Sequence, residues 1–216
     1  MTASSAPSRL SPRATEIVEA ARKLLEAEGL DALSMRRLAD RLGIRAPSLY
    51  KHFADKQELE AAIISAGFEE QAAAFEAALA KTDDPLGSIA TAYRRFASDH
   101  PHLYRLMTER PLQRDKLTPG AEERAAAPDC FVDGSRDKLT PGAEERAAAP
   151  VYEAVGRDLD RARAAWAFAH GMTNLELNGR FPPDADLDAA WKRGIAAFSL
   201  PRPQKRERSR SYDATD

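Results

Sequence analysis

The chain has 216 residues, a formal net charge of −2 and 43% hydrophobic residues, which is enough for one large domain or two small ones with a buried core. Ala is abundant and β-branched residues are few, so the composition favours helices over sheets. The single cysteine, Cys130, excludes a disulfide within the chain. The sequence has no apolar run of about 18 residues that could span a membrane, and its first residues lack the apolar segment of a secretory signal.

The first predicted helix begins at the pair Ser11-Pro12, in which Ser is the N-cap and Pro occupies the first turn. Apolar residues then recur three and four positions apart, as on one face of a helix. Gly29 is a good stop for this helix. A second, short helix is predicted to begin at Ser34 and to end at Gly43.

A third helix is predicted from Pro47 to His52 or Phe53. Two helices joined by a short turn with Gly form a helix-turn-helix, in which the second helix enters the major groove of DNA. Asp55, followed three residues later by Glu, is a capping signature. It predicts a long fourth helix over about 56–80.

The segment from Ser34 to Lys56 is basic. It has six Lys or Arg residues against two Asp, a net charge of +4 in a chain that is −2 overall. Such a concentration of positive charge is typical of surfaces that bind phosphate. Leu49 and Phe53, four residues apart, can face inward and leave the polar residues to face outward. The alternative is a solvated helix pair whose charges are there by chance.

The stretch "ALSMRRLADRLGIRAPSLYKHFADKQELEAAII" resembles the DNA-binding segment of the tetracycline-repressor (TetR) family. The match covers about residues 13–66 and depends on the Leu-Gly turn, the L-Y-x-H-F run and the D-K-x-x-L start of the fourth helix. The resemblance implies an all-α regulator of transcription, with an N-terminal three-helix DNA-binding domain followed by a helical ligand-binding and dimerisation domain. It implies three partners: double-stranded operator DNA, a small-molecule effector and a second copy of the chain.

The resemblance also implies roles for single residues. Base contacts would come from the start of the third helix and from Arg36, and phosphate contacts from hydroxyl, imidazole and ammonium groups around it. Lys56 would in addition lie at a helix N-terminus, where free N–H groups favour anions. A buried His52 and a packing role for Tyr50 are the alternatives. The expected DNA-contacting residues are Ser34, Arg36, Arg45, Ala46, Pro47, Ser48, Tyr50, Lys51, His52 and Lys56.

Residues beyond the fourth helix show further helical patterns, at about 86–99, 101–110, 140–156, 158–179 and 184–199. The stretches "DHPHLYRLM" and "WAFAHGMTNLELNGRF" resemble the C-terminal domain of a TetR subgroup marked by Trp, His and Gly. Aromatic, soft and polar side chains in these helices suit a pocket for an apolar or amphipathic effector, although aromatic residues at helical spacing are more often core. The effector candidates are Tyr93, Phe96, Tyr104, Met107, Trp166, His170 and Asn174.

The last two predicted helices are the expected dimer interface, because family dimers pair these helices into a four-helix bundle. Their apolar residues would form that surface. The candidates are Leu175, Phe181, Trp191, Ile195 and Phe198.

The sequence gives little support for an enzymatic or metal-binding function. His100 and His102 lie close to Asp99, which raises the possibility of a metal site, but no partner motif follows. The sequence has no nucleophile elbow, phosphate loop or zinc spacing. We therefore expect no catalytic residue, no cofactor and no metal, in a cytoplasmic, nucleoid-associated bacterial protein. A regulator without a small-molecule effector, and a binding protein that has lost DNA binding, are the alternatives.

An exact repeat interrupts the C-terminal region. "RDKLTPGAEERAAAP" occurs at 114–128 and again at 136–150, separated by "DCFVDGS". We expect the second copy to occupy the native place and the first to form an extruded loop, although two identical copies could compete for one site. The expected organisation is a flexible arm (1–10), the DNA-binding domain (11–55), the effector-binding and dimerisation domain (56–200) and a disordered basic tail (201–216).

Overall fold

The structure is a computed structural model that describes residues 10–80, 82–109 and 143–199. These ranges contain nine α-helices, one 3₁₀ turn and no strand, so the predicted all-α fold is confirmed. None of the helices in these ranges is long and apolar enough to cross a bilayer. The helices are α1 (Pro12–Glu28), α2 (Met35–Leu42), α3 (Ala46–Leu49), α4 (Lys56–Leu79), α5 (Pro85–Asp99), α6 (Pro101–Thr108), α7 (Ala143–Ala154), α8 (Leu159–Leu177) and α9 (Leu187–Ala196).

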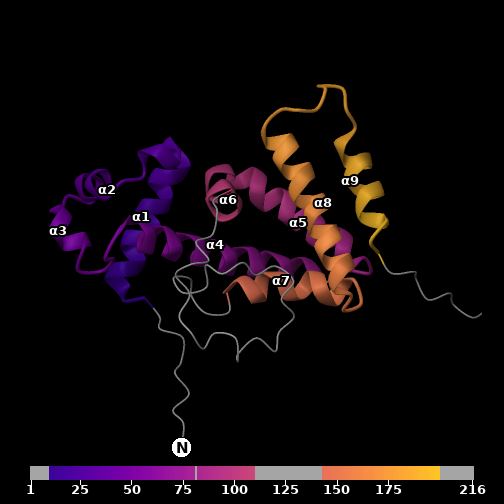
Figure 1. Ribbon diagram of the computed structural model, residues 1–216, viewed down its shortest axis with the longest axis horizontal. Coiled ribbons are helices and arrows are strands. Elements are labelled where there is room, and N and C mark those ends of the chain that lie inside the picture. Colours follow the sequence, from indigo (N-terminus) through magenta and orange to yellow (C-terminus); the bar gives the residue numbers. More distant parts are fainter. Residues whose placement is uncertain (1–9, 81, 110–142, 200–216) are drawn as a thin grey trace, which may run out of the picture.

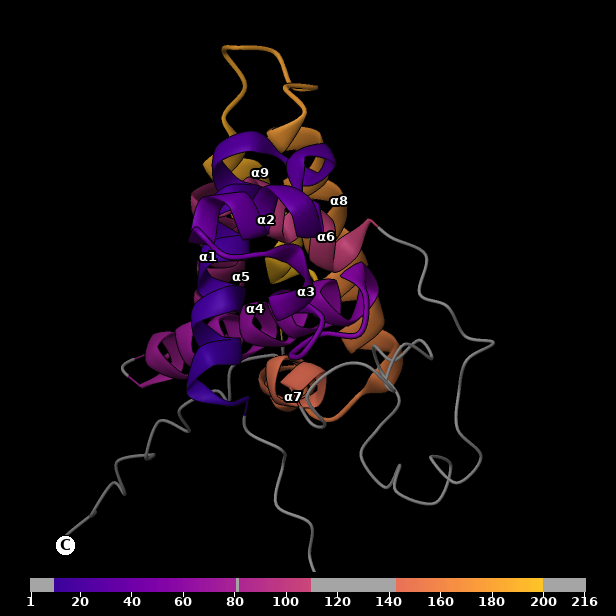
Figure 2. The same cartoon turned by 90° about the vertical axis from the view of Figure 1, so that its left-hand side faces the viewer.

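Helices α1, α2 and α3 gather at one end of the molecule, and we call them the headpiece (Figure 1). The long helix α4 leads away from the headpiece, with α5 and α6 along one side and α7 along the other. Helices α8 and α9 stand next to each other at the opposite end. The view from the headpiece end shows α2 and α3 in front of α4 and α6 (Figure 2).

The helix starts and stops expected from the sequence are present. The Ser11 hydroxyl accepts a hydrogen bond from the N–H of Ala14 at 3.2 Å, and the Asp55 carboxylate accepts one from the N–H of Glu58 at 2.7 Å. Both satisfy N–H groups that a helix start leaves without a partner. Gly43 ends α2 with a φ of 65°, in the left-handed region that favours glycine.

Helix α3 is shorter than predicted. It ends at Leu49, and the chain continues through a turn to His52. The expectation that Leu49 and Phe53 face inward is confirmed, since their side chains are 0% and 2% exposed. The N–H of Phe53 donates to the carbonyl of Leu49 at 3.0 Å. This single hydrogen bond of the α-helical type helps to place both side chains inward, although α3 has already ended.

Helix α7 contains the end of the second repeat copy, residues 143–150, and continues to Ala154. It packs along α4, and Val155 directly after it is fully buried. The helix predicted over 140–156 is thus confirmed within the part of the chain that the structure describes. The first copy and Cys130 lie outside the described residues, as do the expected arm, apart from Leu10, and the basic tail.

Two apolar cores meet along α4. The first joins the headpiece to the start of α4 and to α6, through buried side chains such as Leu25, Ile63 and Leu103. The second joins the far half of α4 to α5, α8 and α9, around Phe75 and Ile89. Burial of these apolar side chains is the main force that holds the helices together. The headpiece is therefore seated on both α4 and α6.

Candidate nucleic-acid interface and regulatory cluster

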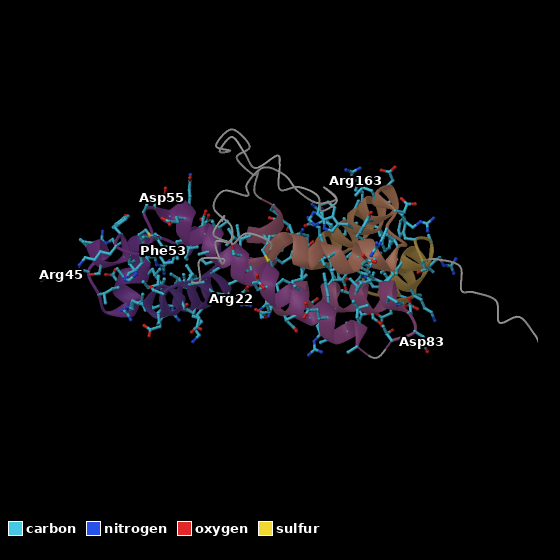
Figure 3. The ribbon with its side chains drawn as sticks, turned by 90° about the horizontal axis from the view of Figure 1, so that it is seen from below. Arg22, Arg45, Phe53, Asp55, Asp83 and Arg163 are labelled. Carbon is cyan, nitrogen blue, oxygen red and sulfur yellow. The ribbon has the colours of Figure 1, made fainter. Side chains whose placement is uncertain are left out.

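The short helix α3 is held by its neighbours in the headpiece. The Ser34 hydroxyl caps α2 by accepting a hydrogen bond from the N–H of Arg37 at 3.3 Å. After Gly43, the N–H of Ile44 returns to the carbonyl of Ala39 at 3.0 Å, which closes the turn between α2 and α3. Leu49 is buried and Ala46 packs against the same core, whereas Pro47 in α3 is exposed. Arg45, which precedes α3, lies at the outer tip of the headpiece (Figure 3).

The ten residues predicted to contact DNA are all exposed or partly exposed. Tyr50 is 52% exposed, so a packing role for this ring is not supported. His52 is partly exposed, so it is not a fully buried histidine. The exposed members are Arg36, Arg45, Pro47, Tyr50 and Lys51, and the half-buried members are Ser34, Ala46, Ser48, His52 and Lys56.

The six positive charges from Ser34 to Lys56 fall into two groups. Arg37 and Arg41 form ion pairs with Glu28 at the end of α1, which local sequence patterns did not indicate. The Lys56 ammonium lies 3.4 Å from the carboxylate of Glu60 on the next turn of α4. The other group consists of Arg36, Arg45 and Lys51, which have no ion pair among the described residues.

A hydrogen-bonded chain of aromatic side chains begins in the second core, to which Tyr93 and Tyr104 belong. The hydroxyls of Tyr93 in α5 and Tyr104 in α6 lie 3.1 Å apart, and the Tyr104 hydroxyl is 2.8 Å from Nδ1 of His170 in α8. The indole of Trp166 stacks on His170 with ring centres 5.4 Å apart. Four of the seven effector candidates are therefore brought together. We call Tyr93, Tyr104, Trp166 and His170 the aromatic cluster.

Burial fixes the charge state of the aromatic cluster. It raises the pKa of Tyr104 to about 12 and raises the pKa of Tyr93 well above its usual value. Burial also lowers the pKa of His170. At neutral pH the two phenols are protonated and the imidazole is neutral. With its proton on Nε2, His170 accepts a hydrogen bond from Tyr104, which in turn accepts one from Tyr93.

The other three effector candidates lie elsewhere. Phe96 and Met107 belong to the core on the headpiece side of the molecule. Asn174 accepts hydrogen bonds from the side-chain amide of Asn178, at 2.8 Å. None of the three joins the aromatic cluster through a hydrogen bond or ring contact within the described residues.

Two of the five dimer candidates face the interior of their own chain. Trp191 and Ile195 in α9 are each 5% exposed and belong to the second core, so they are not available to a partner, contrary to our expectation. Leu175 is 45% exposed, and Phe181 and Phe198 are half-buried. The outer faces of α8 and α9 instead present Ala164, Trp166, Ala167, Leu175, Ala189, Ala190, Ala196 and Ala197.

Helix α9 is tied to α5 and α8 by a charged cluster that the sequence did not suggest. The Arg94 guanidinium donates to the carboxylate of Glu176 at 2.6 Å and to that of Asp188 at 2.5 Å. It also lies over the ring of Trp191, 5.7 Å from its centre. The Trp191 indole N–H donates to the same carboxylate of Glu176, at 3.1 Å. These contacts hold Trp191 in the core.

Metal-binding groups are not collected anywhere in the part of the chain that the structure describes, where no three His, Cys, Asp or Glu side chains are placed to share an ion. His100 instead lies against Glu70, with Nε2 3.1 Å from the carboxylate. His102 lies beside Gly29 at the end of α1.

Comparison with known families gives matches to both parts of the chain. Residues 17–63 match the family described as "Bacterial regulatory proteins, tetR family". Residues 86–198, more than half of the chain, match the family described as "Tetracyclin repressor-like, C-terminal domain". The chain belongs to the TetR family. This family comprises transcriptional regulators and not enzymes, and neither description names the Trp-His-Gly subgroup.

Relatives of this TetR-family chain cover most of its length. The HTH-type transcriptional regulator Rv0681 of Mycobacterium tuberculosis, described as uncharacterized, is 30% identical over 191 residues, which are 86% of this chain and 78% of that protein. A protein of unknown function from Rhodococcus sp. RHA1 has a similar fold, with a TM-score of 0.64, 23% identity and coverage of 87% and 94% of the two chains. A variant of TetR from Acinetobacter baumannii AYE, in complex with minocycline, gives a TM-score of 0.54, 23% identity and coverage of 88% and 94%.

Proposed function

We propose that this TetR-family regulator is a repressor that binds a two-fold-symmetric operator as a homodimer and is released by a small-molecule effector. The observation that carries the DNA-binding part is the second group of headpiece charges. Arg36, Arg45 and Lys51 are exposed without ion-pair partners in the described structure, on the elements that a helix-turn-helix presents to DNA. Cations at this place supply the sequence-independent attraction to phosphate.

A salt titration tests this assignment. We would select a duplex from random DNA with the full chain and measure its affinity at several salt concentrations. Lys51→Ala should weaken binding to all duplexes and reduce the slope of log affinity against log salt by about 0.9, the value for one phosphate contact. Arg95→Ala is the matched control, because Arg95 is 81% exposed but lies in α5, away from the headpiece. Equal slopes for the two variants would contradict a phosphate contact by Lys51.

Base recognition is assigned to the start of α3, with Ser48 as the residue to test. Ser48 is partly exposed within α3. Ser48→Ala should change the preferred base at one or two positions, by roughly 1–3 kcal/mol for each good base contact that the hydroxyl makes. A random-site selection that returns the same consensus for the variant and the unchanged chain would remove Ser48 from the base-reading set.

The dimer is assigned to the outer faces of α8 and α9, where small residues and Leu175 are exposed. Large apolar side chains at such a surface commonly mark an interaction site. Leu175→Asp should shift the chain to a monomer in light scattering. Leu10→Asp is its control, since Leu10 is equally exposed at 44% but precedes α1. A dimer that persists in Leu175→Asp would place the interface elsewhere.

The effector is assigned to the aromatic cluster. Neutral phenol and imidazole groups beside apolar rings suit an amphipathic molecule with one hydrogen-bonding group. Such a ligand must bind the form with low operator affinity better than the DNA-bound form. It should therefore raise thermal stability and lower operator affinity, and Tyr104→Phe should weaken both effects. Ligands that stabilise the chain without changing operator binding would favour the alternative, a regulator controlled by a protein partner.

A further inference from the structure

The start of helix α6 is capped by a side chain from the headpiece. The N–H of Leu103 donates to one oxygen of the Glu26 carboxylate at 2.8 Å, and the N–H of His102 points to the other oxygen at 3.4 Å. The residue that precedes α6, His100, forms no capping hydrogen bond through its own side chain. The carboxylate that satisfies these N–H groups therefore comes from α1, 76 or more residues earlier in the chain.

A second link lies one turn earlier on the same face of α1. Arg22 forms an ion pair with Glu70 of α4, and its side chain is only 23% exposed. The other oxygen of Glu70 is 3.1 Å from Nε2 of His100, at the junction between α5 and α6. Figure 3 shows Arg22 on the side of α1 that adjoins α4. Glu70 thus joins α1 to the same junction that Glu26 caps.

Helix α6 also carries a contact to the regulatory helices. Tyr104, the residue after the capped Leu103, belongs to the aromatic cluster through its bonds to Tyr93 and His170. A helix of eight residues is too short to bend between two such contacts. A shift of α6 that rearranges the aromatic cluster must therefore also change the distance between its first N–H groups and Glu26.

We propose that Glu26 and Arg22 are positioning residues that couple the headpiece directly to α6, so that the state of the regulatory helices is sensed by α1 as well as by α4. The coupling rests on the proposed DNA binding of the headpiece. It needs no contact between these two residues and DNA, since both lie on the side of α1 that faces α4 and α6. The feature that changes between the two states of the regulatory helices is the set of hydrogen bonds from the first N–H groups of α6 to Glu26.

The first experiment measures amide hydrogen exchange in the full chain without DNA, by mass spectrometry. Glu26→Ala should speed exchange of the amides at the start of α6 by about tenfold, since it removes their only acceptor among the described residues. Glu26→Gln retains an acceptor oxygen and should restore much of the protection. Glu19→Ala, an exposed position on the same helix, is the control and should leave α6 unchanged. Equal α6 exchange in all variants would overturn the cap.

The second experiment adds the duplex selected in the salt titration. In the unchanged chain and in Glu26→Gln, DNA should slow exchange in α6, although α6 lies behind the headpiece. In Glu26→Ala, DNA should still slow exchange in α3 but should slow exchange in α6 clearly less, because only the link through Glu70 and α4 remains. A merely structural role for Glu26 would lower stability without separating these two responses. Equal slowing of α6 in Glu26→Ala would overturn the coupling alone, whereas a chain that selects no duplex would overturn the proposed function and the coupling with it.

Discussion

Gly194 in α9 lies against the ring of Phe168 in α8, and its replacement by Ala gives the sharpest test of how these helices pack. A methyl group built on Gly194 would lie 1.9, 2.3 and 2.6 Å from three ring atoms of Phe168. Carbon atoms in contact normally stay about 3.5–4.0 Å apart, so the ring would have to move by well over 1 Å. The ring is held between Trp191 and Phe198, with centres 5.8 and 6.0 Å away.

The expected effect is a loss of stability. Overpacking of a well-packed site costs typically ~1–3 kcal/mol, and the overlap with a rigid ring places Gly194→Ala toward the upper end. Ala gains about 1 kcal/mol over Gly in a helix interior, which leaves a net loss of about 1–2 kcal/mol. For a chain of this size that corresponds to a fall in Tm of roughly 2–8 °C, measurable by circular dichroism.

Gly171→Ala in α8 is the matched control. An added methyl group at Gly171 meets no atom of the chain within 4 Å, so only the gain in helix propensity applies and Tm should rise. Replacing Phe168 by Leu in the Gly194→Ala background should restore part of the stability, because the two changes act on one contact. If Gly194→Ala and Gly171→Ala shift Tm in the same direction, the close packing of α9 on Phe168 is refuted.

Three further changes test other parts of the fold. Arg94→Met should cost about 2 kcal/mol, because charged hydrogen bonds to the partly buried Glu176 are removed; urea denaturation of Arg94→Met, Glu176→Gln and the double variant should show clear non-additivity, and strict additivity would contradict the pair. Glu70→Gln tests acid stability. Burial raises the pKa of Glu70, but the hydrogen bond and charge of Arg22 outweigh burial and lower it below its usual 4.5, so the stabilisation is present above pH 4.5 and is lost as the pH falls below that value. The variant should therefore show a flatter fall in Tm below pH 4.5, and parallel curves would refute this reasoning. Deletion of residues 114–135 should leave folding and dimerisation intact, with a change on the order of 1 kcal/mol; an insoluble or monomeric product in light scattering would show that the first copy belongs to the fold.

Local signals in the sequence predicted the local structure well. The N-caps at Ser11 and Asp55 and the left-handed Gly43 each depend on residues within one turn, so their patterns are readable without the fold. The predicted length of α3 was wrong for a related reason. A spacing of four between Leu49 and Phe53 predicts inward placement, but a single hydrogen bond between them achieves it without a continued helix.

Contacts between distant segments had no such signal. An apolar stripe on α9 can pack within its own chain or on a partner, and the spacing of Trp191 and Ile195 is the same in both cases. The structure places them in the core of their own chain because Arg94 and α8 cover them there. The cap of α6 by Glu26 is likewise invisible in the sequence, since no local pattern in either segment indicates the other.

The burial of Val155 decides how the chain distinguishes its two identical segments. When the copies are aligned, Val155 corresponds to Asp133 and Val151 to Asp129. Val155 is fully buried beside α7, so the first copy in this place would bring a carboxylate into an apolar core, where an unpaired charge is strongly disfavoured. The residues that follow the shared segment, and not loop closure alone, therefore favour the second copy in this place, as we expected from the sequence. Residues 143–150, which both copies could supply, form most of α7, and the few residues that follow select which copy occupies this place.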